Sequence, residues 1–415
     1  MAIIKPFKAY RPQPNLAKHI ASYPYDVINS AEAKTLAEGN PYSFLRVVKP
    51  EIDVPEGTDV YADAVYLKGK ENMQAFIQQG TFFLEETSCY YVYQLEMEGH
   101  IQTGLVAAAS VEEYFTGRIK IHELTRPIKE NDRKQHISLS GIVAEPVFFA
   151  YRGVRQINAI LQNITQELPL YSFQADDGIY HRLWRISQQA IIDEISMLFE
   201  HKVPATYVAD GHHRTAAAAL VGKERTEKGE DLPGATFFMA VHFPAEELQI
   251  LDYNRVVTDL GDLSSTALLS ELEKHFILIP SQEAVAPSSP YTFGMYLEGK
   301  WYSLQLKEDL YPSGDLISQL AVSVLDKYVI HPLLKVTDIR RDKRIDFVGG
   351  IRGLSELERR VDSGEMKLAF SIPPVKMDQL LEIADHKQIM PPKSTWFEPK
   401  LRSGLLVYSL SESLS

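Results

Sequence analysis

The stretch ATYVADGHHRTAAAALVGKERTEKG, residues 205–229, joins a short β-favouring segment to a long helix-favouring one. ATYVAD has aromatic and β-branched residues at its centre, which favour a strand. TAAAALVGKERTEKG is rich in helix-forming residues and ends at Gly229, a residue type that commonly follows the last turn of a helix. The sequence therefore predicts a strand, a turn made by DGHHR, and then a helix.

The DGHHR turn has the composition of an anion site. Asp210 is a candidate N-terminal cap of the helix, and Gly211 permits a close approach that a side chain would block. A helix N-terminus has unpaired N–H groups and the positive end of the helix dipole, and Arg214 adds a guanidinium. With His212 and His213 beside these groups, the turn favours an anion, and phosphate above all.

Two other interpretations of this turn stay open. A simple capped helix, whose histidines pack or face solvent, has the same sequence pattern. Asp210, His212 and His213 are also possible metal ligands. Adjacent histidines on a helix point about 100° apart, however, so a single ion seldom binds both of them.

A second polar stretch is GRIKIHELTRPIKENDRKQHI, which begins at residue 117. His122 beside Glu123 has the composition of an acid–base pair, and Lys129 and Arg133 suit phosphate binding. Asp132 adds a further carboxylate. A solvated, charged connector explains the same composition, and the spacing alone does not choose between the two.

Two further stretches are candidates for the same site. MPPKSTWFEPKL, residues 390–401, contains Lys393, Ser394 and Thr395 between prolines, but it lacks the glycines of a P-loop. SYPYDVINSAEA places Asp26 just before a predicted helix that is capped at Asn29 or Ser30. An ordinary turn and cap would also account for this second stretch.

Composition limits the possible classes of protein. The chain has 415 residues, which favours two domains or one large elaborated domain. Its 43 basic and 55 acidic residues give a formal charge of −12. This acidic balance disfavours a general nucleic-acid binder. The single cysteine, Cys89, excludes an internal disulfide and fits a reducing compartment. Neither a signal peptide nor a membrane span is evident, so we expect a cytoplasmic protein without a membrane partner.

The pattern of elements changes near Gly261. Before it, short strands alternate with helices, including a hairpin built from residues 89–97 and 104–111, a helix over 63–80, a helix over 181–201 and a buried strand over 236–243. After it, the sequence predicts a smaller α+β unit. Its expected elements are a helix at 265–276, a hairpin at 291–306, a helix at 315–329, and strand, helix, strand and helix between 345 and 386.

Taken together, the motifs YPYDVI, NPYSFLRV, HELT with KENDR, ADGHHRTAAA and PPKSTWFEPKL resemble the domain of unknown function 1015 family over nearly the whole chain. That family is similar in turn to the ParB/sulfiredoxin-like superfamily. The resemblance implies an α+β fold with a ParB/sulfiredoxin-like mixed core at 1–260. An α+β accessory domain at 261–385 and a C-terminal segment at 386–415, returning to the site, would complete the chain.

DGHHR is similar to the corresponding element of the ParB-related free-serine kinases, which move a nucleotide phosphoryl group onto the serine hydroxyl with magnesium. The resemblance implies that Gly211, His213 and Arg214 hold phosphate. It also implies that Asp210 and His212 are the reactive or metal-facing members, with Mg²⁺ at Asp210. Asp26 and Glu123 both compete for the role of the catalytic base.

Phosphoryl transfer to a small molecule would give a role to each of the four polar stretches described above. Arg214, Lys393, Ser394, Thr395 and the helix N-terminus would hold the phosphates of ATP or ADP. Glu123 or Asp210 would accept the proton of the substrate hydroxyl. We therefore expect a Mg²⁺-dependent phosphotransferase acting on a small hydroxyl metabolite, free serine included. The alternatives are a non-catalytic regulator that binds a nucleotide or phosphometabolite, and a ParB-like nuclease, which the acidic charge disfavours. Composition gives no indication of the oligomeric state.

Overall fold

The computed structural model describes residues 1–414 and divides the chain into two compact units. The first unit is Met1–Leu248 with the C-terminal segment that begins at Pro399, and the second is Gln249–Glu398. The expected boundary at 260 therefore moves toward the N-terminus, because the strands that precede it belong to sheets of the second unit. The expected segment 386–415 is divided at Glu398. The chain has a mixed α+β fold, as expected, whereas the relation to the ParB/sulfiredoxin-like superfamily stays a prediction.

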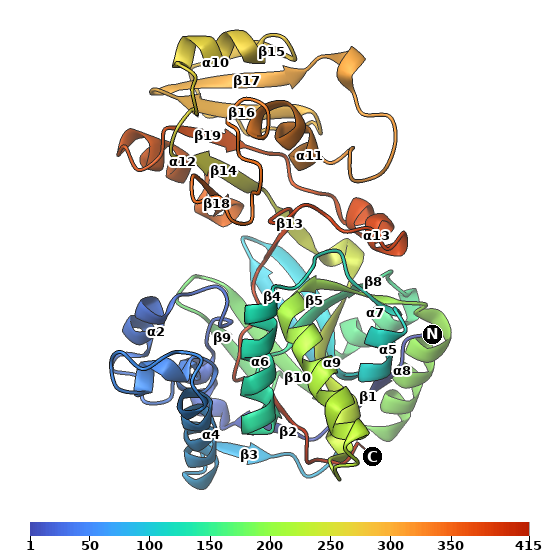
Figure 1. The fold of residues 1–415 in the computed structure, drawn as a ribbon. Helices are drawn as coiled ribbons and strands as arrows, with labels where there is room; N and C mark the ends of the chain where they lie inside the picture. The colour runs from blue at the N-terminus through green and yellow to red at the C-terminus, as the bar shows by residue number, and fades with distance from the viewer. Residues whose placement is uncertain (415) are drawn as a thin grey trace. The chain divides into compact units, whose positions relative to one another are not determined.

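One large mixed sheet forms the centre of the first unit (Figure 1). Strand β8 pairs in parallel with β12 and antiparallel with β11, the strand that precedes the DGHHR turn. The strands in sheet order are β6 (Ile119–Lys120), β11 (Thr206–Asp210), β8 (Val147–Tyr151), β12 (Phe237–Pro244), β5 (His100–Ser110), β4 (Tyr90–Met97), β10 (Tyr180–Ile186) and β9 (Tyr171–Gln174), with β1 (Ile4–Lys5) beside β5.

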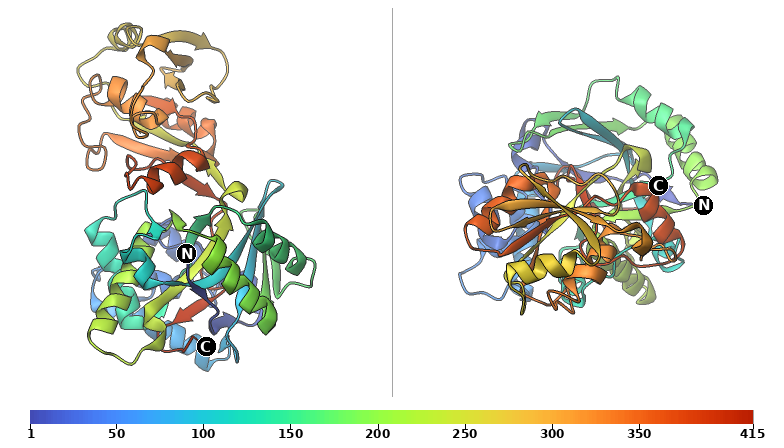
Figure 2. Two further views of the ribbon diagram at one scale, coloured as in Figure 1. Left: turned by 90° about the vertical axis from the view of Figure 1, so that its right-hand side faces the viewer. Right: turned by 90° about the horizontal axis from the view of Figure 1, so that it is seen from above.

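Helices cover this sheet and a smaller one. Helix α9 (His212–Glu227) packs on β8, β11 and β12 and against α6 (Pro127–Ser140) and α5 (Val111–Phe115). Apolar side chains of α7 (Arg155–Ile164) and α8 (Gln189–Lys202) pack against residues of β4 and β5. Figure 2 shows two further views of these layers. The remaining helices of the unit are α1 (Ala17–Ile20), α2 (Ser30–Ala37), α3 (Leu45–Val48) and α4 (Asp63–Gln78).

The smaller sheet joins distant parts of the first unit. Its strands in order are β3 (Phe82–Leu84), β2 (Ala9–Pro12), β21 (Val407–Ser409) and β7 (Ile142–Val143). Because β21 pairs with both β2 and β7, the C-terminal segment is fixed inside the unit. This pairing brings the residues that follow Pro399 back to the middle of the first unit.

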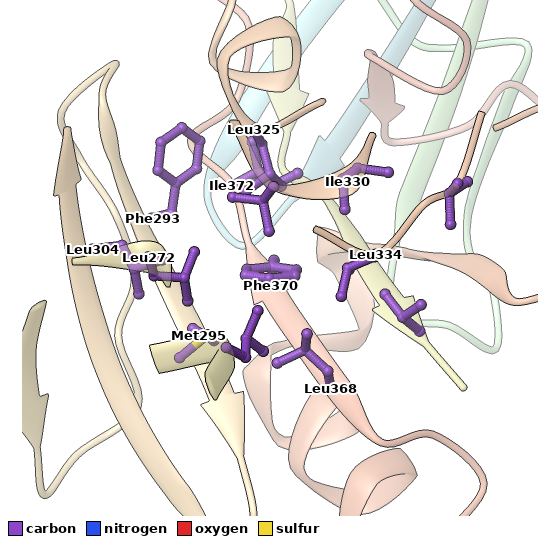
Figure 3. Close-up of a cluster of buried hydrophobic side chains, with 14 of the residues drawn as sticks. Leu272, Phe293, Met295, Leu304, Leu325, Ile330, Leu334, Leu368, Phe370 and Ile372 are labelled. Carbon is purple, nitrogen blue, oxygen red and sulfur yellow. The ribbon is translucent and has the colours of Figure 1, made fainter. Parts of the chain in front are cut away.

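The second unit is an antiparallel sheet covered by short helices. Its strands in order are β15 (Phe276–Ser281), β17 (Lys300–Leu306), β16 (Thr292–Leu297), β19 (Leu368–Ser371), β14 (Tyr253–Val257) and β18 (Ile345–Gly349), with β13 (Gln249–Leu251) and β20 (Trp396–Glu398) as a separate pair. Phe370 lies at the centre of an apolar cluster (Figure 3). The helices are α10 (Ser265–Leu272), α11 (Ala321–Leu325), α12 (Leu354–Asp362) and α13 (Met377–Asp385).

Most of the predicted elements are confirmed. The first hairpin turns at Glu98 and Gly99, both with positive φ, which is the conformation that a tight two-residue hairpin needs. Asn29 caps α2 in a capping box with Glu32. The helix predicted over 181–201 is wrong in its first part, because residues 180–186 form β10, whose buried and exposed side chains largely alternate. The helix predicted over 315–329 begins only at Ala321 and continues as a π-helix over Asp326–Ile330.

No helix within residues 1–414 has both the length and the apolar character that crossing a membrane requires.

Several histidines of the first unit are buried as neutral groups. Burial lowers the pKa of His242 from 6.5 to about 3, and its ring lies between Phe149 and Phe199 at centroid distances of 5.4 and 5.6 Å. The unfolded chain binds a proton near pH 6.5, whereas the folded chain does not until about pH 3. The contribution of the neutral His242 side chain to the free energy of unfolding is therefore fully present above pH 6.5 and is lost as the pH falls toward 3. The pKa is lowered in the same direction for His122, His136, His181 and His212.

We expect His242→Phe to reduce the dependence of stability on pH. Between pH 6.5 and 4, the free energy of unfolding of the variant should fall by about 1.4 kcal/mol less per pH unit than that of the unmodified chain, because one titrating group is gone. Urea denaturation at several pH values measures this slope. His201→Phe, at an exposed position of α8, controls for the added ring. If the free energy of unfolding had the same slope against pH in His242→Phe and in the unmodified chain, the assignment of His242 as a buried neutral group would be contradicted.

Candidate functional site

The turn between β11 and α9 is built around Gly211. Gly211 has φ +90°, in the left-handed region that favours glycine, and it is the N-cap residue of α9. The prediction that Asp210 caps the helix is wrong: its Oδ1 accepts a hydrogen bond from the Gly211 N–H at 2.9 Å instead. His212, His213 and Arg214 therefore lie in the first helical turn, and among the described residues no side chain caps this helix.

Arg214 is held inside this turn. It is only 5% exposed, and its Nη1 donates to the Pro146 carbonyl at 2.7 Å. Its Nη2 lies 3.8 Å from Oδ2 of Asp26 and 3.8 Å from Oδ2 of Asp210, too far for a hydrogen bond to either. A Cβ on Gly211 would stand 3.0 Å from Arg214 Cζ, so glycine leaves room for the guanidinium.

Asp210 is anchored on both oxygens. Oδ2 accepts from Lys400 Nζ at 3.1 Å, while Oδ1 bonds the Gly211 N–H. Burial acts to raise the pKa of Asp210, but the charges of Lys400 and Arg214 outweigh it and hold the pKa well below its usual range. Asp210 is therefore ionised in the folded chain and tied to the C-terminal segment.

His122 and His212 form a buried pair. Their rings meet edge to face at a centroid distance of 4.4 Å, and they are 1% and 7% exposed. Burial first, and then the neighbouring imidazole of His122, lowers the pKa of His212 far below 6.5. Nε2 of His212 has no hydrogen-bond partner within residues 1–414. The pair is therefore neutral at physiological pH.

His213 connects the turn to the start of α6. Its Nε2 accepts a hydrogen bond from the Arg126 N–H at 2.9 Å, one residue before α6 begins. Burial lowers the pKa of His213, which keeps Nε2 available as an acceptor. This contact places the 121–126 loop beside the turn.

Asp26 is a partly exposed carboxylate of the cluster. Its side chain is 32% exposed, compared with 27% for that of Asp210 and 6% for that of Arg214. The preceding residue, Tyr25, is buried, and its N–H donates to Glu145 Oε1 at 2.9 Å. Burial raises the pKa of Glu145 although the charges of Arg214 and Arg133 oppose this shift. The buried Tyr25–Glu145 contact thus fixes the backbone that presents Asp26.

Arg133 supports the same backbone. Its guanidinium lies 3.8 Å from the Tyr25 ring centroid and pairs with Asp132 at 3.0 Å and Glu145 at 3.5 Å. Its Nη1 also donates to the Val48 carbonyl at 3.2 Å, and Tyr66 donates to Asp132 at 2.9 Å. The donor groups of Arg133 are therefore engaged within the protein.

The structure brings some of the predicted residues together and leaves others apart. Asp26, Asp210, Gly211 and Arg214 meet at one point, and His122, His212 and His213 adjoin them. Glu123 follows the buried His122 and is half-buried, while Lys129 is exposed on α6. The predicted phosphate-binding residues Lys393, Ser394 and Thr395 belong to the second unit, so their part in this site stays a prediction.

Two members of the cluster were not singled out from the sequence. Lys400 ends the PPKSTWFEPK stretch, and only its pairing with Asp210 gives it a place in the site. Glu145 lies in an otherwise apolar stretch, AEPVFFA, where an isolated acidic residue was the only available signal. Both are 8% exposed or less.

The residues around the turn offer few ligands for a metal ion. Within residues 1–414 there is no cluster of three or more His, Cys, Asp or Glu side chains suited to holding an ion. Asp210, the predicted magnesium ligand, already has a partner on each oxygen. Asp26 and Asp210 keep 32% and 27% of their side chains exposed, so their hydrogen bonds and not their exposure distinguish the two carboxylates.

We expect Lys400→Met to destabilise the first unit by about 2–3 kcal/mol, because it leaves the Asp210 carboxylate without its nearest counter-charge in a mostly buried site. Combining it with Asp210→Asn should cost less than the sum of the two single changes. Urea denaturation measures the cycle. Lys223→Met, which removes an exposed pair with Glu227, should change stability by less than about 0.5 kcal/mol. Strict additivity of the first two substitutions would show that the pair is not coupled.

Comparison with known proteins identifies a matching family. It also finds solved structures whose overall similarity to this chain is low. Free serine kinase in complex with AMP is 14% identical, with a TM-score of 0.35 over 73% of this chain and 92% of the kinase. A conserved hypothetical protein from Pyrococcus furiosus is 14% identical, with a TM-score of 0.34 over 74% and 95%. C-terminally truncated SbnI from Staphylococcus aureus is 11% identical, with a TM-score of 0.39 over 74% and 87%.

These TM-scores are low, so the similarities carry no part of the functional argument. No match is found among curated proteins. Residues 4–328 match the family described as Protein of unknown function (DUF1015). This match spans most of the chain, and the protein therefore belongs to the DUF1015 family.

Proposed function

We propose that the β11–α9 turn binds the phosphates of a nucleotide and that the protein transfers a phosphoryl group to the hydroxyl of a small metabolite. One observation carries the proposal. The Nη2 of a buried arginine, Arg214, makes no hydrogen bond to the two carboxylates beside it, and one of these, Asp26, is partly exposed. A cationic donor and a carboxylate thus stand side by side at an uncapped helix N-terminus.

Phosphate binding follows from the start of α9. The first N–H groups of a helix have no partner inside the helix, and the dipole adds a partial positive charge at the same end. No side chain within residues 1–414 caps α9, and Gly211 removes the Cβ that would crowd the turn. Arg214 Nη2 supplies a further donor for a phosphate.

Asp26 is the carboxylate that we assign as the base. Asp210 is engaged on both oxygens, whereas the nearest cation to Asp26, Arg214 Nη2, stands 3.8 Å away and makes no hydrogen bond to it. In the proposed step, Asp26 accepts the proton of the substrate hydroxyl while that oxygen forms a bond to the terminal phosphorus. The bond from phosphorus to the bridging oxygen breaks, and the shortened nucleotide leaves with the electron pair.

Arg214 would stabilise the charge that develops on the transferred group. Asp210 and Lys400 would position Arg214, and Arg133 with Glu145 would position the Tyr25–Asp26 backbone. In this proposal these four residues position others and do not touch the substrate. From the sequence, direct roles were expected for two of them: catalysis or metal binding for Asp210 and phosphate binding for Arg133.

Magnesium fits this arrangement mainly as an ion brought by the nucleotide. Mg²⁺ keeps several waters and binds largely through substrate phosphates, so the ion would be held mainly by the nucleotide and Asp26 would stay free to act as the base. The ion would neutralise charge on the phosphates. ATP or ADP as the donor, and free serine as the acceptor, are the finer parts of the proposal.

We expect Asp26→Asn to bind nucleotide as well as the unmodified chain and to lose at least a hundredfold in turnover, because the proton acceptor is gone. The assay combines the full chain, Mg²⁺, ATP or ADP and free serine or pooled hydroxyl metabolites, with mass spectrometry of the products. Asp176→Asn, at a 98% exposed carboxylate of the same unit, is the matched control and should keep full turnover. Retained turnover in Asp26→Asn would transfer the base to Glu123.

Arg214→Lys tests the phosphate contact separately. We expect nucleotide affinity to fall at least tenfold in calorimetric titration, because lysine keeps the charge but lacks the planar fork that meets phosphate oxygens. Arg182→Lys, at a partly exposed arginine on β10, should leave the affinity unchanged. Unchanged affinity in Arg214→Lys would remove the turn as the phosphate site. If the unmodified chain binds nucleotide but forms no product, the alternative of a non-catalytic, nucleotide-binding regulator would be favoured.

A further inference from the structure

The second unit contains a small polar pocket that the proposed reaction does not use. Its volume is about 280 Å³, and all of its lining residues lie in the second unit. Strand β18, the edge strand of its sheet among the described residues, provides one wall. Helix α12 with the loop before it provides a second wall, and Trp396 a third. The volume lies near the lower end for ligand pockets, which suits a small molecule.

The charges on the pocket wall are balanced. Three arginines and three carboxylates line it. Arg360 pairs with Asp346 at 2.8 Å and with Glu365 at 2.7 Å, and Arg359 pairs with Glu356 at 2.7 Å through each of two nitrogens. The two pairs of Arg360 connect α12 to β18 through Asp346 and to the loop before β19 through Glu365.

Arg352 is the lining arginine that stands outside these pairs. It is exposed, and no ion pair joins it to a carboxylate within residues 1–414. Asp346 has the most exposed carboxylate of the three, with 52% of its side chain accessible and a single arginine partner. The wall thus offers one available cation and one partly available anion.

We propose that this pocket binds a free α-amino acid as its zwitterion. The carboxylate of the ligand would pair with Arg352, and its ammonium group would pair with Asp346. A ligand with both charges meets a counter-charge for each, whereas a nucleotide would bring two or more negative charges against three carboxylates. A simple cation would in the same way meet three guanidinium groups.

Trp396 supplies an apolar wall in a fixed position. Its ring lies against the backbone of Gly349, where an added Cβ would stand 2.7 Å from ring atoms, and it meets the Tyr253 ring edge to face at 5.1 Å. Its Nε1 donates to Glu398 Oε1 at 2.9 Å. The side chain of the amino acid would pack beside this ring, so occupancy changes the environment of a natural fluorophore.

The experiment titrates the full-length protein with each of the twenty common L-amino acids while recording tryptophan fluorescence and, separately, heat. We expect at least one amino acid to bind with a dissociation constant of millimolar or lower. Its N-acetyl and its amide derivatives should bind at least tenfold more weakly, because each lacks one charge. Trp396→Phe should remove the fluorescence response, which assigns that signal to the ring at the pocket wall.

Two arginine variants locate the binding. Arg352→Gln should weaken binding at least tenfold, and Arg341→Gln, at an 89% exposed arginine of the same unit outside the pocket, should leave it unchanged. Arg214→Lys should also leave it unchanged, because the proposed phosphate site is in the first unit. Loss of binding in Arg214→Lys but not in Arg352→Gln would overturn this inference and place the amino acid at the phosphotransfer site. Absence of binding by all twenty amino acids would overturn it, and the phosphate site of the proposed function would still be tested separately by the nucleotide affinity of Arg214→Lys.

Discussion

The Arg214 guanidinium is 5% exposed, and a charge withdrawn from water to this extent needs acceptors and counter-charges close by. The Pro146 carbonyl, Asp26 and Asp210 meet this requirement from three separate parts of the chain. Burial acts to lower the pKa of Arg214, but the carboxylates around it outweigh burial and raise it. The arginine therefore stays charged, and the β8 strand, the YPYD segment and the β11–α9 turn are held around it.

The C-terminal segment completes this arrangement by its path through the first unit. Strand β21 pairs with β2 and β7, and Ser403 exchanges backbone hydrogen bonds with Ser22, four residues before Asp26. Lys400 precedes these contacts and reaches Asp210 at 3.1 Å. Without this lysine, two carboxylates would face one guanidinium. The electrostatic balance at the turn thus depends on residues almost two hundred positions away in sequence.

Local patterns explain what could be predicted from the sequence. Strand β11, helix α9 and the first hairpin follow from propensity and from glycine in turns, and Asp26, Gly211 and Arg214 follow from unusual residue types at a turn. Residues 180–186 were misassigned because HRLWRI has apolar residues at spacings that suit a helix as well as a strand. Lys400 and Glu145 act only through long-range pairing, which no local pattern reveals. The unit boundary was also missed, because it depends on which sheet β13 and β14 join.

The contacts of the site are of two kinds: hydrogen bonds already made within the protein, called the framework here, and hydrogen-bonding capacity that is left for a ligand. Arg214 Nη1 bonds the Pro146 carbonyl at 2.7 Å, and Asp210 bonds Gly211 and Lys400, so these groups are fixed before any ligand arrives. Nη2 instead stands 3.8 Å from Asp26, a separation that leaves its hydrogen-bonding capacity unused. A phosphate oxygen that bonds Nη2 would therefore add a contact without breaking the framework, and preorganised donors of this kind stabilise charge without a cost of rearrangement. Because Asp26 borders the same nitrogen, a hydroxyl placed for attack on that phosphate would lie within reach of a carboxylate.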